Sequence, residues 1–190
     1  MQQPSVRILV PMPEGVEEME ITIIVDVLRR AGLGVVTAGL PGRQIRASRG
    51  MVLVADTEWS DVDISSFDVL ILPGGAPGTR LLMQTPGILA AVRQMIQTDK
   101  WVGAICAGPL VLQAAGVLKG RRITCHPAVA GDIHVTCPLS DPVVEDGRLI
   151  TSRGPGTAFR FALQWVTVLQ GKALANRLAA EMVLSAAEVG

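Results

Sequence analysis

The sequence has no tyrosine, only three phenylalanines and three tryptophans, and only two histidines. It has no apolar run of eighteen residues, so it predicts no transmembrane helix. The N-terminal residues do not show a basic segment followed by an apolar one, and we therefore expect no signal peptide and a cytoplasmic location. Basic and acidic residues balance at 17 each, without a basic stripe. Direct nucleic-acid binding is therefore not indicated.

Cysteine is scarce as well, with Cys106, Cys125 and Cys137 alone. An odd number without a C-x-x-C pair makes a poor disulfide framework and a poor zinc site. We therefore expect no metal and no cofactor. The remaining question about the cysteines is which thiol is reactive.

The chain contains enough apolar sequence for one large core, because nearly half of its 190 residues are hydrophobic. We predict a single domain over residues 1–190. Strands and helices alternate, which indicates an α/β fold with a mainly parallel, doubly wound sheet. Strands are expected at 6–10, 34–38, 68–72, 101–105 and 122–124, hairpins within 44–54 and 143–150, and helices at 17–31, 85–98, 110–116, 158–170 and 173–187.

Cys106 lies between an apolar run, residues 101–105, and an apolar segment from Leu110 that predicts a helix. Small residues flank it, as in the strand–turn–helix nucleophile elbow that carries serine in G-x-S-x-G enzymes. A helix N-terminus beside the thiol would lower its pKa, and we expect this here. The alternative is a buried, inert cysteine.

Three further groups are candidates for the site. Glu20 is on the packed side of the first helix, where burial would raise its pKa and let it hydrogen-bond a thiolate or move a proton. Gly74 and Gly75 follow a buried strand and serve either a turn or an oxyanion hole. His126 precedes a proline in a loop, and is either structural or close enough to reach the thiol.

Together these segments resemble the ThiJ/PfpI superfamily, in the branch of the Parkinsonism-associated protein deglycase. The resemblance extends from the first strand almost to the C-terminus, and its motifs keep the order and spacing of the family. The matching segments are Glu17-Glu-Met-Glu20, Val27-Leu-Arg-Arg-Ala-Gly32, Ser48-Arg-Gly50, Leu72-Pro-Gly-Gly75, Ala104-Ile-Cys-Ala-Gly-Pro109, His126-Pro127 and Ser152-Arg-Gly-Pro-Gly-Thr157.

The resemblance implies a flavodoxin-like sandwich that forms a homodimer. It implies that Cys106 is the reactive, oxidisable nucleophile and that the Glu20 carboxyl is hydrogen-bonded to it. His126 would complete the catalytic group. Backbone groups of Gly74, Gly75 and Ala107 would bind the substrate oxyanion.

The resemblance also implies an activity. The expected enzyme is a glutathione-independent glyoxalase or deglycase that converts glyoxal or methylglyoxal, free or as protein and nucleotide adducts, to hydroxy acids and protects against oxidative stress. The alternative is a non-enzymatic redox sensor or redox-regulated chaperone that uses oxidation of Cys106. Ala107 stands where the PfpI branch has histidine, which weakens a Cys-His peptidase, and no His-x-Glu pair indicates a glutamine amidotransferase.

Overall fold

The computed structural model of the protein describes residues 6–185. Its centre is a seven-stranded sheet in the order β5-β2-β1-β6-β7-β9-β8, parallel except for the antiparallel pair β8–β9. The strands of this sheet are β1 (Arg7–Pro13), β2 (Gly34–Leu40), β5 (Thr57–Glu58), β6 (Val69–Leu72), β7 (Trp101–Ile105), β8 (Val143–Asp146) and β9 (Leu149–Ser152). A separate antiparallel hairpin, β3 (Gln44–Arg46) and β4 (Val52–Val54), lies beyond β2 in the chain.

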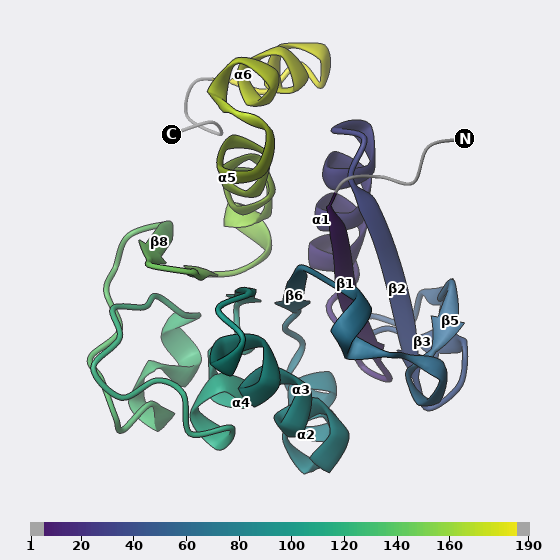
Figure 1. Ribbon diagram of the computed structural model, residues 1–190, viewed down its shortest axis with the longest axis vertical. Helices are drawn as coiled ribbons and strands as arrows, with labels where there is room; N and C mark the ends of the chain where they lie inside the picture. Colours follow the sequence, from purple (N-terminus) through teal and green to yellow (C-terminus); the bar gives the residue numbers. More distant parts are fainter. Residues whose placement is uncertain (1–5, 186–190) are drawn as a thin grey trace.

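Within the described residues, six α-helices cover the two faces of the sheet (Figure 1). The helices are α1 (Glu18–Arg30), α2 (Ala76–Gln84), α3 (Pro86–Gln97), α4 (Pro109–Ala114), α5 (Ala158–Gln170) and α6 (Lys172–Glu181). In Figure 1 the teal helices α2, α3 and α4 gather together, away from α5 and α6. The structure therefore confirms the predicted mainly parallel α/β sandwich.

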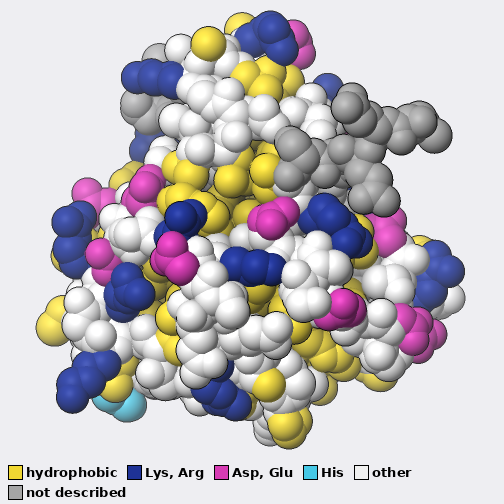
Figure 2. Space-filling model, viewed as in Figure 1, with side chains coloured by type: hydrophobic (Ala, Val, Ile, Leu, Met, Phe, Trp, Pro, Cys, Tyr) yellow, Lys and Arg dark blue, Asp and Glu magenta, His cyan; other side chains and the backbone are white. Residues whose placement is uncertain are grey.

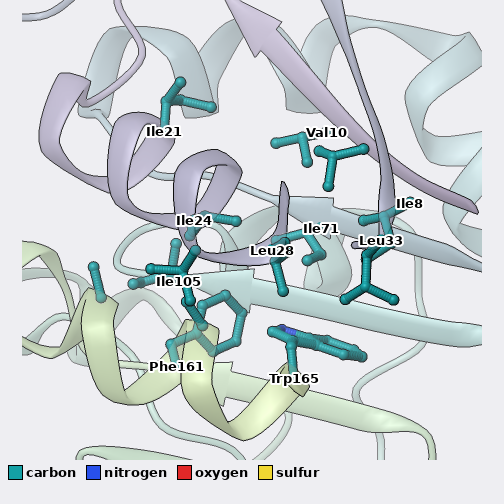
Figure 3. Close-up of a cluster of buried hydrophobic side chains, with 14 of the residues drawn as sticks. Ile8, Val10, Ile21, Ile24, Leu28, Leu33, Ile71, Ile105, Phe161 and Trp165 are labelled. Atoms are coloured by element: carbon teal, nitrogen blue, oxygen red, sulfur yellow. The ribbon is translucent and has the colours of Figure 1, made fainter. Parts of the chain in front are cut away.

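Alternation along the strands gives each face its own core. In β1, Ile8 and Val10 pack with α1 and α5, whereas Leu9 points to the opposite side, against α3 and α4. Successive side chains of a strand point to opposite faces, so one strand supplies both cores. Figure 3 shows the first core, in which Phe161 and Trp165 of α5 face the isoleucines of α1 and of the sheet.

Strand β1 is longer than predicted, because it continues through Pro11 and Pro13. Glu14 N–H donates to Leu40 O of β2, so the amide positions of Pro11 and Pro13 face the other side, toward β6. The pairing of β1 with β6 stops at Leu9. The missing proline N–H groups therefore leave the pairing of β1 with β2 intact up to Pro13 and Leu40.

Three other predictions need correction. Helix α2 is absent from the prediction, because Pro77 and Gly78 resemble a loop, yet proline is well tolerated in a first helical turn. Residues 122–124 form no strand: Thr124 makes only an isolated bridge with Leu139. The last helix ends at Glu181, and the predicted end at residue 187 lies outside the described residues.

Candidate active site

Cys106 occupies a sharp turn between β7 and α4. Its φ of +62° is uncommon for a residue with a side chain, and matches the strained backbone of a nucleophile elbow. Two backbone hydrogen bonds fix this turn: Cys106 N–H donates to Ser152 O, and His126 N–H donates to Cys106 O, both at 2.9 Å. The sheet thus holds the half-buried thiol at the carboxyl end of β7, where parallel sheets bind ligands.

Glu20 of α1 supports the thiol from inside the protein. Its side chain is fully buried and hydrogen-bonds with Cys106. Gly74 N–H donates to Glu20 Oε2 at 2.7 Å. A Cβ atom on Gly74 would lie 2.5 Å from Cys106 Cβ and 2.8 Å from Glu20 Oε2, so only glycine fits between the two side chains.

Burial raises the pKa of Glu20 to about 7, because the desolvated carboxylate is costly and the negative charge of Glu17 adds to this cost. The hydrogen bonds from Gly74 and Cys106 act in the opposite direction but are weaker. Glu20 Oε1 is also buried, and it accepts no hydrogen bond from the described residues. The expected rise in the pKa of Glu20 is confirmed.

The expectation for the thiol is wrong. Burial raises the pKa of the Cys106 thiol, and the charge and hydrogen bond of Glu20 raise it as well. These causes outweigh the amides of Gly75 and Ala107, which lower it, and the pKa of Cys106 is about 12. Local sequence indicates a helix N-terminus at Cys106 but not the depth of the thiol. The resemblance places the Glu20 carboxyl group beside the thiol, and its negative charge opposes the effect of the helix. The pair therefore loses its first proton near pH 7 and holds one proton above it, and Cys106 is a thiolate when that proton is on Glu20.

The outer side of Cys106 faces an open pocket of about 320 Å³. Gly75 and Ala107 both line it and form backbone hydrogen bonds with the thiol. Gly75 has a φ of +92°, a left-handed conformation that favours glycine. The remaining lining residues are Glu17, Ser48, Arg49, Ala76, Pro77, His126, Ala128, Val129 and Pro155.

Of the residues expected to bind an oxyanion, Gly74 has a different position. It is buried, its N–H is occupied by Glu20, and it does not line the pocket. Glu20 does not line the pocket either, so the geometry offers no direct contact between its carboxyl group and a substrate. Glu20 and Gly74 instead support Cys106 from behind.

His126 shares the pocket with Cys106. Its Nδ1 accepts a hydrogen bond from Ala128 N–H at 3.2 Å, so the neutral ring carries its proton on Nε2. The ring lies close to Gly154, where a Cβ atom would be 3.2 Å from His126 Cδ2. The imidazole is thus oriented as a hydrogen-bond donor.

Ser48 and Arg49 also line the pocket. The resemblance puts Arg49 near the pocket or the dimer interface without a catalytic role, whereas sequence reasoning missed Ser48. Glu18 holds their loop at the pocket, since its carboxylate accepts Ser48 Oγ at 2.8 Å and Arg49 N–H at 2.6 Å. Burial opposes the ionisation of Glu18, but hydrogen bonds from its own backbone N–H and from Ser48, Arg49 and Met51 together lower its pKa. The sequence does contain the family motif Ser48-Arg-Gly50, but nothing in the neighbouring sequence shows that this loop contacts Glu18 or the pocket.

Within residues 6–185 no group of three or more histidine, cysteine, aspartate or glutamate side chains is placed to hold a metal ion. The helices of this part of the chain are all too short or too polar to cross a membrane. Figure 2 shows basic and acidic side chains mixed over the face in view, without a basic stripe. Cys125 and Cys137 are also free thiols, one buried and one exposed.

The fold and the site define the class of protein: a mainly parallel α/β sandwich in which a cysteine at a nucleophile elbow has a buried carboxyl partner. Residues 6–168 match the DJ-1/PfpI family. The chain belongs to this family, which is the superfamily that the sequence motifs indicated.

Individual relatives agree over almost the whole chain. The chain is 40% identical to glutathione-independent glyoxalase DJR-1.2 of Caenorhabditis elegans, over 96% of this chain and 98% of that protein. It is 38% identical to the Parkinson disease protein 7 homolog of Danio rerio, over 94% and 97% of the two chains. The crystal structure of Drosophila melanogaster DJ-1beta superposes with a TM-score of 0.91 at 37% identity, covering 95% of this chain and 99% of the other.

Proposed function

We propose that the protein is a glutathione-independent glyoxalase that converts glyoxal or methylglyoxal to the hydroxy acid. The observation that supports this best is the Cys106–Glu20 pair, which places a proton-sharing carboxyl group behind a thiol that faces a small pocket. The name of the glyoxalase relative from Caenorhabditis elegans supports the same activity. Neither metal nor glutathione has a part in the proposed reaction.

The reaction begins when the thiol proton moves to Glu20 and the Cys106 thiolate attacks the aldehyde carbon, C1. The carbonyl oxygen becomes an oxyanion that the N–H groups of Gly75 and Ala107 stabilise, and it takes up a proton from solvent to give a hemithioacetal. His126 Nε2–H donates a hydrogen bond to the neighbouring carbonyl oxygen on C2.

A proton then moves from C1 to C2, which oxidises C1 and reduces C2 within one molecule. The product is a thioester of the 2-hydroxy acid with Cys106. Water hydrolyses this thioester, releases lactate from methylglyoxal or glycolate from glyoxal, and restores the thiol. Adducts of the same dicarbonyls with protein or nucleotide amines are further proposed substrates, with the amine as an additional leaving group.

The test is lactate formation from methylglyoxal by purified protein without glutathione. We expect the wild-type protein to form lactate and Cys106→Ser to form none above the uncatalysed rate. Equal rates for the two proteins would exclude the proposed activity.

A redox sensor is the second candidate, because a half-exposed thiol beside a protonated carboxyl group also suits a stabilised sulfinate. One similar solved structure is Toxoplasma gondii DJ-1 in an oxidised form, with a TM-score of 0.91 at 33% identity. In this case peroxide should modify Cys106 before Cys125 and Cys137. If peroxide oxidises the exposed Cys137 but leaves Cys106 unmodified, the redox-sensor function is excluded.

We also propose that the 190 residues act as one cytoplasmic domain and form a homodimer. Four large apolar side chains are exposed on α1 and on the β3–β4 hairpin: Met19, Met51, Val52 and Val54, at 55%, 54%, 48% and 68%. We name these four residues the α1–hairpin patch. Exposed apolar groups concentrated in this way indicate a contact with another protein surface, and a second copy of the chain is the proposed partner.

A further inference from the structure

The proposed reaction needs a base that reaches the substrate carbons, and Glu20 does not meet this need. Its side chain has no exposed surface and lies behind Cys106, outside the lining of the pocket. Glu17 does line the pocket, together with Cys106 and His126. It is the only carboxylate among the described residues that line this pocket.

The backbone of Glu17 is fixed against the glycines of the site. Glu17 N–H donates to Gly74 O at 3.2 Å. A Cβ atom on Gly75 would lie 2.7 Å from Glu17 N, so the two residues are in close contact. The carboxylate is fixed too, since Glu17 Oε2 accepts Glu20 N–H at 2.9 Å as the N-cap of α1.

Glutamate is an unusual choice for this position. Serine, threonine, aspartate and asparagine are the preferred N-caps, because their short side chains reach the amide of the third helical residue. The longer side chain of Glu17 fulfils the same role in a residue that lines the pocket of Cys106. Helix capping alone does not require the extra methylene group.

The other polar side chains in the pocket are less suited to accept a proton from carbon. His126 Nδ1 is occupied by the N–H of Ala128, which leaves Nε2–H as a donor. Arg49 is a permanent cation. Ser48 Oγ is used as a donor to Glu18.

We propose that Glu17 is a further catalytic residue, the general base that carries the proton from C1 to C2 of the dicarbonyl bound to Cys106. This inference rests on the proposed glyoxalase function. A lone pair of the Glu17 carboxylate takes the C1 proton, and the C1–H electron pair forms the C=C bond of an enediolate, whose C2 oxygen accepts a hydrogen bond from His126 Nε2–H. Glu17 returns this proton to C2 as the C1=O bond of the thioester forms, and the hydroxyl proton on the C1 oxygen passes to the C2 oxygen. No external oxidant or reductant takes part.

The experiment compares wild-type protein, Glu17→Gln and Glu14→Gln in lactate formation from methylglyoxal. Glutamine keeps an oxygen that accepts the Glu20 N–H, so the helix cap is retained. We expect kcat of Glu17→Gln to fall about 100-fold, the size of a general-base contribution, with KM within about threefold of the wild-type value. Glu14→Gln is the matched control: Glu14 also accepts a backbone N–H, from Arg46 at 2.9 Å, but it is outside the pocket, and its kcat should be unchanged.

Alkylation of Cys106 by iodoacetamide separates loss of the base from damage to the thiol, and its rate in Glu17→Gln should remain within about threefold of wild type. A folded Glu17→Gln with wild-type kcat would overturn the inference and leave the proposed function intact.

If Glu17→Gln does not fold, Glu17→Asp provides the test. Aspartate is a strong N-cap, but its side chain is one methylene shorter and holds the carboxylate farther from the substrate. At least a tenfold fall in its kcat is expected, and a wild-type kcat would overturn the inference. Wild-type protein without lactate formation would contradict the proposed function itself.

Discussion

Glu20 Oε2 accepts the backbone N–H of Gly74 at 2.7 Å, and the same glycine leaves no space for a Cβ atom beside Cys106. One residue of the loop after β6 thus orients the buried carboxyl group and lets the thiol approach it. The contact joins three elements, because Glu20 comes from α1 and Cys106 follows β7. The chemistry of the site depends on how this pair shares its proton.

Replacement of Glu20 by glutamine should change the pH dependence of the thiol. Glutamine still accepts the Gly74 N–H but carries no charge, and it therefore removes two causes that raise the pKa of Cys106. In the wild-type protein we expect the alkylation rate of Cys106 by iodoacetamide to rise through about pH 7, where the pair loses its first proton. In Glu20→Gln the step near pH 7 should be absent, and an unchanged step would show that another group causes it.

The same replacement should change the pH dependence of stability. A glutamate side chain in the unfolded chain has a pKa of 4.5, whereas burial raises the pKa of Glu20 to about 7, so the folded state binds the proton more tightly. This contribution is complete below pH 4.5 and is lost as the pH rises to 7, and it amounts to about 3 kcal/mol. Urea unfolding should show that the free energy of unfolding differs less between pH 4.5 and pH 7.5 for Glu20→Gln than for wild type. Equal differences for the two proteins would contradict a buried Glu20 with a raised pKa.

Much of this site could be predicted from local sequence. Around Cys106 the sequence runs from a strand through small residues to a helix. The sharp turn and its position at the end of a strand could be predicted from this order. Burial of Glu20 followed from helical spacing. By contrast, the raised pKa of Cys106 depends on a carboxylate from an element 86 positions earlier in the chain, and no local pattern reveals that charge.

The pocket lining shows the same limit. The role of Gly74 depends on the direction in which its N–H points. The N–H donates to Glu20, but from the sequence alone it could equally have donated to a substrate. Ser48 and Arg49 enter the pocket because Glu18 holds their loop across a distance of thirty residues in the sequence. The unpredicted helix α2 has a different, local cause, since proline occurs both in loops and in a first helical turn.

An alanine at position 74 should damage both stability and activity. Its Cβ atom would overlap the Cys106 side chain and Glu20 Oε2, and overpacking of this kind costs about 2 kcal/mol. We expect Gly74→Ala to lower the free energy of unfolding by that amount and to slow alkylation of Cys106. Gly131→Ala is the matched control, because no atom lies within 4 Å of its added Cβ. Equal stability of the two variants would contradict the close packing at Gly74.

The α1–hairpin patch predicts where a second copy binds. A charge in this patch should separate the protomers, because an aspartate would have to be buried without a partner. We expect wild-type protein to sediment as a dimer at micromolar concentration and Val54→Asp to sediment as a monomer. Val183→Asp is the control, since Val183 is 89% exposed and lies outside the patch. A monomeric wild-type protein, or a dimeric Val54→Asp, would contradict the proposed interface.

The most direct test of the Cys106 nucleophile is rapid quenching of the protein with methylglyoxal, followed by mass analysis of peptides and of lactate. The proposed reaction predicts an adduct with the mass of one methylglyoxal on the Cys106 peptide, which forms and decays at the rate of lactate release. The adduct and the lactate should both be absent in Cys106→Ser. Lactate formed by Cys106→Ser at the wild-type rate, or an adduct on Cys106 that persists while lactate accumulates, would contradict nucleophilic catalysis by this residue.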